Sequence, residues 1–193
     1  MGRYDLWKRG MDLFFSAVLL FFLALPMAGI ALAVWVSSEG GVIFRQVRVG
    51  QNGAPFVCYK FRTMRREAPR DCPSAKLGDR AHWVTPVGRV LRRTSLDELP
   101  QLLNVLKGDM SLVGPRPLIP AEESVHELRR RYGADRLRPG ITGLAQVRGR
   151  DGLDDRRKAA YDARYLRRMS LLTDLSILLL TFFQVPTGEG MRE

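Results

Sequence analysis

The sequence has few cysteine and histidine residues, and their scarcity argues against several kinds of site. Among 193 residues only Cys58 and Cys72 are cysteines, and they do not form a C-x-x-C pair. We therefore expect no disulfide framework and no zinc site, but two structural thiols in reduced, cytosolic surroundings. His82 and His126 are isolated in the sequence, which argues against a histidine-based metal or catalytic cluster.

Negative charge is also scarce. Lysine and arginine number 31 against 20 aspartates and glutamates, so the net charge is +11 and the isoelectric point is near 10.4. Such a balance predicts an anionic partner, either nucleic acid, a phospholipid surface or a phosphorylated substrate. The length predicts one domain, or one domain with an appendage.

The run 13–36 contains 24 residues, of which Ser16 has the only polar side chain. At about 1.5 Å per residue a helix of this length could cross a hydrocarbon core of about 30 Å. Pro26 interrupts the run, however, and basic residues flank both of its ends, against the positive-inside tendency of a spanning helix. A re-entrant helix that breaks at Pro26 and returns to the same face satisfies both facts. A third reading is a signal peptide with an A-x-A site at 31–33.

The remaining sequence predicts one hairpin and several helices. Residues 40–64 alternate apolar and polar side chains around Gln51-Asn52-Gly53, which indicates a β-hairpin. Residues 65–83 read as a surface loop, and 138–152 as a glycine-punctuated loop or short strand. A short helix or turn is expected at 86–93, and helices at 101–107, 120–133 and 154–168. The apolar segment 170–185 is too short to span a bilayer and reads as either a core helix or an interfacial helix.

Two adjacent acids, Asp97 and Glu98, precede Pro100 in an otherwise basic region. Pro100 suits the first position of a helix, and Leu99 before it is biased out of the α region. In a second register Ser95 is the N-cap, with Glu98 as its capping-box partner. Either register places the acids where backbone N–H groups converge, and acids at a helix start are commonly only structural.

An arginine between two prolines favours a functional role for these two acids over a purely structural one. Gly114-Pro115-Arg116-Pro117 restricts the backbone around Arg116, as planar, bidentate phosphate recognition requires. Further basic residues lie upstream of these two motifs: Lys60, Arg62, Arg92 and Arg93. Cations that converge on the acids, together with a divalent metal, would let an ionised carboxylate approach a diphosphate and attack phosphorus.

Four motifs then occur in an order that resembles the bacterial sugar transferases, the monotopic phosphoglycosyl transferases that act on polyprenyl phosphate. The motifs are YKFRTM at 59–64, TPVGRVLRRTSLDELPQLLNVLKGDMSLVGPRPLIP at 85–120, RPGITGLAQVRGR at 138–150 and YDARYLRRMSLLTDLSILLLTFF at 161–183. The resemblance covers about residues 4 to 185. The larger members' extra spans and added soluble domain are not seen, so the resemblance implies the minimal catalytic form.

The resemblance implies that a UDP-sugar donates its sugar 1-phosphate to undecaprenyl phosphate in a ping-pong reaction that requires Mg²⁺. Asp97 would be the nucleophile and a metal contact, and Glu98 would be essential beside it. Lys60, Arg62, Arg92 and Arg116 would bind phosphate. The implied reaction is the first membrane step of surface glycan biosynthesis.

The resemblance also implies the architecture and the location. We expect a mostly helical α+β fold, with a re-entrant membrane helix broken at Pro26 in residues 1–38 and a catalytic domain in residues 39–193. Interfacial helices would hold that domain at the cytoplasmic face of the bacterial inner membrane, against its lipids. A homodimer is left open.

A loop at 138–150 departs from the family pattern, with Leu144 and Arg148 where many relatives carry Trp and Asn. We associate Thr142, Gln146 and Arg148 in this loop with donor recognition, so the identity of the sugar is open. Two rivals remain: a membrane-tethered basic module that binds nucleic acid, and a non-catalytic scaffold of the same shape. The intact Asp97-Glu98 pair argues against the scaffold.

Overall fold

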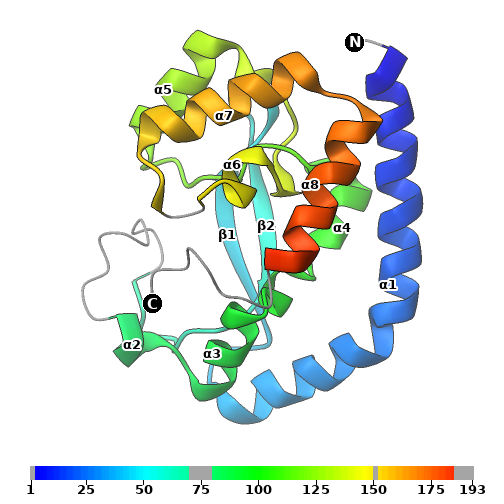
Figure 1. The fold of residues 1–193 in the computed structure, drawn as a ribbon. Helices are drawn as coiled ribbons and strands as arrows, with labels where there is room; N and C mark the ends of the chain where they lie inside the picture. Colours follow the sequence, from blue (N-terminus) through cyan, green and yellow to red (C-terminus); the bar gives the residue numbers. More distant parts are fainter. Residues whose placement is uncertain (1–2, 70–79, 150–151, 185–193) are drawn as a thin grey trace.

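The computed structural model describes residues 3–69, 80–149 and 152–184. Helices surround a central antiparallel hairpin, so the predicted mostly helical α+β class is confirmed (Figure 1). The helices are α1 (Arg3–Ser37), α2 (Arg80–Trp83), α3 (Pro86–Arg93), α4 (Gln101–Lys107), α5 (Glu123–Tyr132), α6 (Leu144–Val147), α7 (Asp155–Arg168) and α8 (Leu171–Gln184). The strands are β1 (Ile43–Val49), β2 (Pro55–Phe61), β3 (Ser111–Val113) and β4 (Gly140–Thr142).

The predicted hairpin is formed by β1 and β2, in a register that pairs Phe44 with Lys60 and Gln46 with Cys58. Asn52 and Gly53 adopt φ angles of 55° and 80° in the turn, as the residue types predicted. A second sheet was not predicted. It consists of β3 and β4, which are parallel and come from segments about thirty residues apart in the chain.

The predicted helices form with small shifts of their ends. Gly108 and Gly133 end α4 and α5 in the left-handed conformation, with φ angles of 98° and 71°. Asp154 caps α7 by accepting a hydrogen bond from the backbone N–H of Arg157. The expected surface loop at 65–83 instead contains α2 at its end, and its residues 70–79 lie outside the described residues, as does Cys72.

Helix α1 is long and apolar enough to cross a membrane, and it contains Pro26. Figure 1 shows the helix bending between a half that runs along one side of the molecule and a half that runs beneath it. A proline inside a helix is a common cause of such a bend. Both halves pack on the same body. Arg9 donates to the carbonyl of Val105 at 2.7 Å, and Val34 is buried against Phe61 and Leu91.

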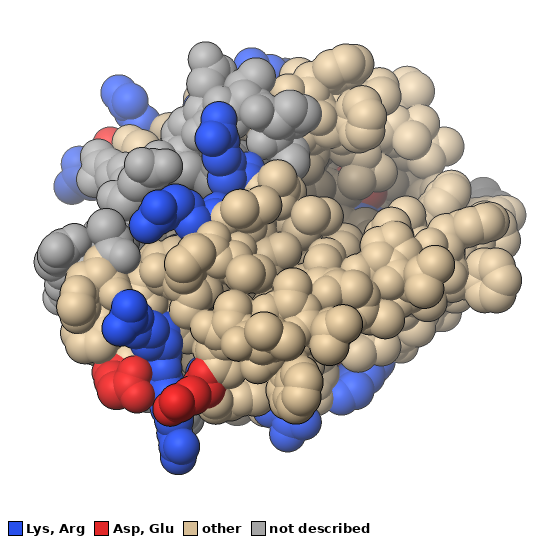
Figure 2. Space-filling view, turned by 90° about the horizontal axis from the view of Figure 1, so that it is seen from below, with Lys and Arg blue, Asp and Glu red and all other residues tan. Residues whose placement is uncertain are grey.

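In helices α1 and α8 several polar residues face inward, and most of the large apolar residues face outward. Asp12, Ser16 and Asp174 are at most 5% exposed, whereas Phe21 and Phe182 are 78% and 73% exposed. Figure 2 shows a broad uncharged surface on the underside, with most charged residues near its edges. This inversion suits a non-aqueous environment and favours the interfacial reading of 170–185 over a core helix.

Candidate active site

The acidic pair lies in a 3₁₀ turn, Leu96–Glu98, directly before α4. Pro100 is the N-cap of α4, and Leu99 adopts the α conformation with φ −53° and ψ −38°. The expected extended conformation of Leu99 was therefore wrong, because the 3₁₀ turn continues straight into the helix. The capping box was also wrong, since Ser95 has a φ of 56° and its side chain makes no capping bond.

Glu98 is held by two cations from different parts of the chain. The Nζ atom of Lys60 on β2 lies 2.5 Å from Oε1 of Glu98, and Nη1 of Arg116 lies 3.6 Å from the same oxygen. The side chains of Lys60 and Glu98 are less than one-fifth exposed, whereas that of Arg116 is 43% exposed. Because its side chain is only partly buried, Arg116 can still contact a ligand while it is paired with Glu98.

The two carboxyl groups have shifted pKa values of opposite sign. Burial raises the pKa of Asp97 to about 6, and the neighbouring charge of Glu98 adds to the effect, against Lys60, Arg92 and Arg116. Burial also opposes ionisation of Glu98, but Lys60, Arg116 and Arg48 outweigh it and lower its pKa to about 2. Glu98 is therefore a fixed anion, and Asp97 is a less stabilised carboxylate with greater basicity.

Sequence reasoning missed Arg48 and Gln101 as site residues. Both line a small cavity together with Cys58, Lys60, Glu98, Arg116, Pro117 and Ile141. Arg48 donates to the carbonyl of Pro117 at 3.1 Å, and burial together with Arg116 lowers the pKa of its guanidinium. The hairpin pattern could have indicated Arg48, because side chains alternate between the two faces of a strand. Positions 44, 46 and 48 therefore lie on the face that carries Lys60.

The backbone of Gly114-Pro115-Arg116-Pro117 is fixed, as predicted, but by more than its prolines. Arg129 donates to the carbonyl of Arg116 at 3.0 Å and is itself held by Asp162, with 2.8 Å between Nη2 and Oδ2. The backbone N–H of Gly140 donates to the carbonyl of Pro115 at 2.8 Å. The arginine therefore projects from a rigid segment.

Glycines let this segment approach β4 closely. A Cβ atom on Gly114 would lie 2.3 Å from the carbonyl oxygen of Arg138, and one on Gly143 would lie 2.0 Å from the oxygen of Gly114. Only glycine fits both positions without moving backbone. Two glycine-containing motifs that are separate in sequence thus form one support for Arg116.

The other predicted phosphate-binding residues lie in different places. Arg92, in the last turn of α3, acts electrostatically on Asp97. Arg62 is buried and donates through Nε to the carbonyl of Gly41 at 2.8 Å. It lies outside the residues that line the cavity, and its contact with a phosphate stays a prediction.

The predicted donor loop touches the cavity through Ile141. Thr142 is buried, with its hydroxyl 2.7 Å from that of Thr181 on α8. The Gln146 amide donates to the carbonyl of Ile141 at 2.8 Å, and Arg148 is exposed. The structure therefore gives Thr142 and Gln146 roles within the loop, and direct donor contacts of all three residues stay predictions.

The two acids could bind a metal ion only if a substrate supplied further ligands. Among the described residues, no group of three or more acidic, histidine or cysteine side chains could hold an ion alone. Mg²⁺ commonly uses one or two carboxylates together with substrate phosphates. Since Glu98 is already bound by Lys60 and Arg116, Asp97 is the carboxylate better suited to such a shared ion.

Comparison with known proteins identifies the family. A bacterial sugar transferase model matches residues 3–188. The chain belongs to the bacterial sugar transferase family. The predicted resemblance is thereby confirmed, and so is the prediction that this chain is an enzyme of the phosphoglycosyl transferase class.

Several curated relatives are similar over most of the chain. A UDP-glucose:undecaprenyl-phosphate glucose-1-phosphate transferase of Caulobacter vibrioides is 47% identical over 92% of this chain and 68% of its own length. An uncharacterized sugar transferase of Bacillus subtilis, EpsL, is 45% identical over 79% of this chain and 73% of its own length. An Escherichia coli enzyme, named like the Caulobacter one, is 41% identical over 95% of this chain but only 41% of its own length.

Proposed function

We propose that this enzyme transfers glucose 1-phosphate from UDP-glucose to undecaprenyl phosphate, giving undecaprenyl diphosphate glucose and UMP. The buried Asp97, beside an ionised Glu98 and next to Lys60, Arg92 and Arg116, is the observation that carries this proposal. The choice of glucose rests on the relatives, several of which are named for that sugar.

The cations would bind the donor diphosphate. Lys60, Arg48, Arg92 and Arg116 provide four positive charges against the two carboxylates of Asp97 and Glu98, so the site carries an excess of positive charge. Arg116 suits a phosphate best, because its guanidinium is partly exposed on a rigid backbone. Asp97 would be the residue that holds Mg²⁺, which would supply further neutralisation of the phosphate charge.

Asp97 would then act as the nucleophile. A carboxylate oxygen attacks the phosphorus that carries the sugar, the bond from that phosphorus to the bridging oxygen breaks, and UMP leaves with the electron pair. The product is an acyl phosphate, in which the carboxyl group of Asp97 carries the sugar phosphate. With a pKa near 6, Asp97 is mostly ionised at neutral pH yet more basic than an ordinary aspartate.

The acceptor would complete the cycle. A phosphate oxygen of undecaprenyl phosphate attacks the same phosphorus, the bond from phosphorus to the Asp97 oxygen breaks, and the carboxylate is restored. Glu98, fixed by Lys60, would keep the turn that carries Asp97 in place during both steps.

The outward apolar faces of α1 and α8 support a position at the membrane surface. We propose a monotopic enzyme of the bacterial inner membrane with its catalytic domain on the cytoplasmic face. Its acceptor keeps a long isoprenoid in the bilayer and presents its phosphate at the interface. Basic side chains near anionic lipids would add about 1 kcal/mol each to this association.

The decisive experiment uses purified protein in detergent with UDP-glucose, undecaprenyl phosphate and Mg²⁺. We expect UMP release, a covalent protein adduct when the acceptor is omitted, and loss of both in Asp97→Asn by at least about 10³-fold. Asp155→Asn, in the first turn of α7, is the matched control and should match the wild type.

A panel of other UDP-sugars tests the choice of glucose. UMP release with a different sugar and none with UDP-glucose would reject the donor but keep the reaction. A salt-sensitive nucleic-acid gel shift without UMP release from any donor would instead favour the binding-module rival.

A further inference from the structure

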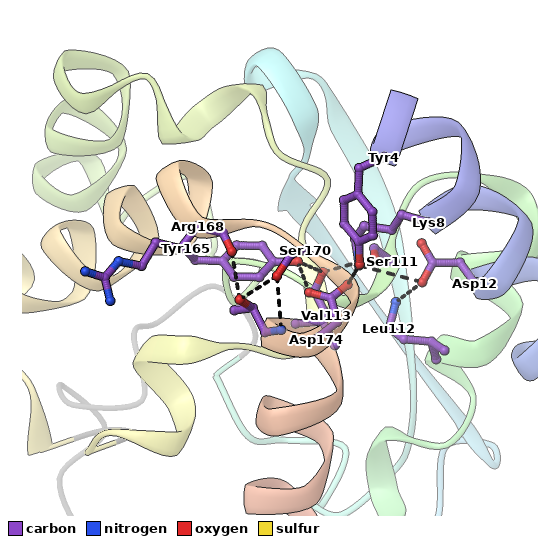
Figure 3. A network of polar contacts seen from close by, with 11 residues as sticks. Tyr4, Lys8, Asp12, Ser111, Leu112, Val113, Tyr165, Arg168, Ser170 and Asp174 are labelled. Atoms are coloured by element: carbon purple, nitrogen blue, oxygen red, sulfur yellow. Dashed lines mark hydrogen bonds and ion pairs between the residues drawn. The ribbon is translucent and has the colours of Figure 1, made fainter. Parts of the chain in front are cut away.

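A buried polar network joins both apolar helices to the catalytic core (Figure 3). The carboxylate of Asp174 on α8, which is 5% exposed, accepts three hydrogen bonds. Tyr4 and Lys8 of α1 donate to Oδ2 at 2.9 and 2.6 Å, and Tyr165 of α7 donates to Oδ1 at 2.6 Å. Three helices thus meet at one carboxylate.

The same network reaches strand β3. Asp12 of α1 accepts a hydrogen bond from the backbone N–H of Leu112 at 3.0 Å, and Lys8 lies 4.0 Å from the same carboxylate oxygen. The Tyr165 hydroxyl also lies within 3.3 Å of the carbonyl oxygen of Val113. Successive residues of β3 are therefore contacted from α1 and from α7.

Strand β3 leads directly into the segment that carries Arg116. Val113 precedes Gly114, whose backbone N–H donates to the carbonyl of Thr142 at 2.8 Å. Close backbone contacts of Gly114 with Arg138 and Gly140 leave this segment little room to adjust. A shift of β3 would therefore move Arg116 relative to Glu98, which now lies 3.6 Å away.

Stability alone does not explain the buried ion pair between Lys8 and Asp174. The side chains of Lys8 and Asp174 are 11% and 8% exposed, and removing such charges from water costs about as much as their attraction returns. Apolar side chains would suit the surroundings of two apolar helices equally well. A charged pair with fixed hydrogen bonds does, however, specify one register where apolar packing allows several.

We propose that Asp174 is a positioning residue for the transfer reaction. Together with Lys8 and Asp12, it sets the register of α1 and α8 against β3, and so holds Arg116 where the donor diphosphate binds. The seating of the apolar helices in the membrane is thereby linked to the phosphate site. This inference rests on the proposed function for its kinetic consequence but not for its structural one.

The test is the double variant Lys8→Met with Asp174→Asn. It removes both charges but leaves an amide whose oxygen can accept from Tyr4 and whose NH2 group can donate to the hydroxyl of Tyr165. We expect thermal stability close to that of the wild type, faster amide hydrogen exchange in residues 111–116, and a KM for UDP-glucose raised about tenfold. Unchanged exchange together with an unchanged KM would overturn the proposal.

Ile177→Val is the matched control for simple destabilisation. Ile177 lies on α8 within the core cluster of Val113 and Tyr165, and the change removes one methylene without touching a polar contact. It should lower the melting temperature without raising the donor KM. If it raises KM as much as the double variant does, the effect is one of stability and the positioning role is rejected.

Asp12 gives a second, independent variant pair. Asp12→Asn keeps an oxygen for the N–H of Leu112 and should retain the wild-type KM, whereas Asp12→Ala should raise it. Equal KM values for the two would contradict the proposal. Should the wild type release no UMP from any donor, the proposed function fails, and the exchange measurement still decides whether the network holds β3.

Discussion

The Nζ atom of Lys60 lies 2.5 Å from the Oε1 atom of Glu98, so a β-strand residue and a 3₁₀-turn residue 38 positions apart form the centre of the site. Lys60 also acts electrostatically on Asp97, whose pKa it lowers against the effect of burial. One ammonium group therefore fixes one carboxylate and partly determines when the other is ionised.

Activity should fall as the pH drops through about 6. The nucleophile is the ionised form of Asp97, and burial raises the pKa of that carboxyl to about 6. The rate of adduct formation should therefore decline about tenfold per pH unit below that value. Glu98, with its pKa near 2, stays ionised over this range and adds no second limb.

Replacing Lys60 should shift the acid limb of the pH–rate profile, where activity falls, to higher pH. Lys60→Met removes the cation that most strongly lowers the pKa of Asp97, so the limb should shift to higher pH. Lys158→Met, a half-buried lysine on α7, is the control and should leave the limb in place. Single-turnover UMP release from pH 5 to 8 measures both, and a limb that does not move in Lys60→Met would exclude the electrostatic link.

Asp97→Asn and Glu98→Gln should change stability in opposite directions. The pKa of Asp97 is raised on folding, so its ionisation destabilises the native state by about 3 kcal/mol above pH 6. Asp97→Asn should therefore increase the free energy of unfolding at pH 7.5, and the increase should disappear as the pH falls through 6 towards 4.

Ionisation of Glu98 has the opposite effect on stability from ionisation of Asp97. Its pKa is lowered on folding, so its contribution is present above about pH 4.5 and is lost as the pH falls towards 2. Glu98→Gln should be destabilising at pH 7.5, since it also leaves Lys60 without its carboxylate partner. Denaturant unfolding of both variants from pH 4 to 8 gives the answer, and shifts of equal sign would contradict the charge assignment.

Local signals were sufficient to predict most of the elements. The turn at Asn52 and Gly53, the helix that ends at Gly108 and the acids at the start of that helix all follow from a few neighbouring residues. The conformation of Leu99 did not follow, because a rule for residues before proline was overridden by the 3₁₀ turn.

Contacts between distant segments could not be predicted in this way. The pairing of β3 with β4, and the close approach of Gly114 to Gly143, join segments with no shared periodicity. The alternation of the hairpin places Arg48 on the face of Lys60, but its role depends on the contact between that face and the acidic turn, which the sequence does not show. Asp12 and Asp174 lie at or within apolar segments, and the structure shows that both face inward.

Gly114→Ala should impair the site without touching a charged residue. The new Cβ would lie 2.3 Å from the oxygen of Arg138 and 2.9 Å from the nitrogen of Gly140, so β3 and β4 must separate. We expect a loss of activity of at least about tenfold with a raised KM for the donor, because Arg116 moves with the strand. Gly152→Ala, where nothing lies within 4 Å, should be neutral, and a fully active Gly114→Ala enzyme would show that Arg116 need not be held rigidly.

The two ends of α1 should lie on the same side of the membrane. The helix is long enough to span, but Arg9 near its start donates to Val105 while Val34 near its end packs on Phe61. A straight helix from residue 9 to residue 34 would extend about 37 Å, so a spanning helix would place these contacts on opposite faces of the bilayer. The bend in the helix that contains Pro26 lets both contacts form on one body.

Single cysteines at Leu6, Glu39 and Tyr132, in a background with Cys58 and Cys72 replaced, can report this arrangement through an impermeant maleimide. Tyr132 on α5 is 47% exposed and marks the side of the catalytic domain. In intact cells and after lysis, Leu6→Cys and Glu39→Cys should label in the same pattern as Tyr132→Cys. If one end labels in intact cells while the Tyr132 position labels only after lysis, α1 spans the bilayer, and its two sets of contacts with the catalytic domain cannot both exist in the membrane.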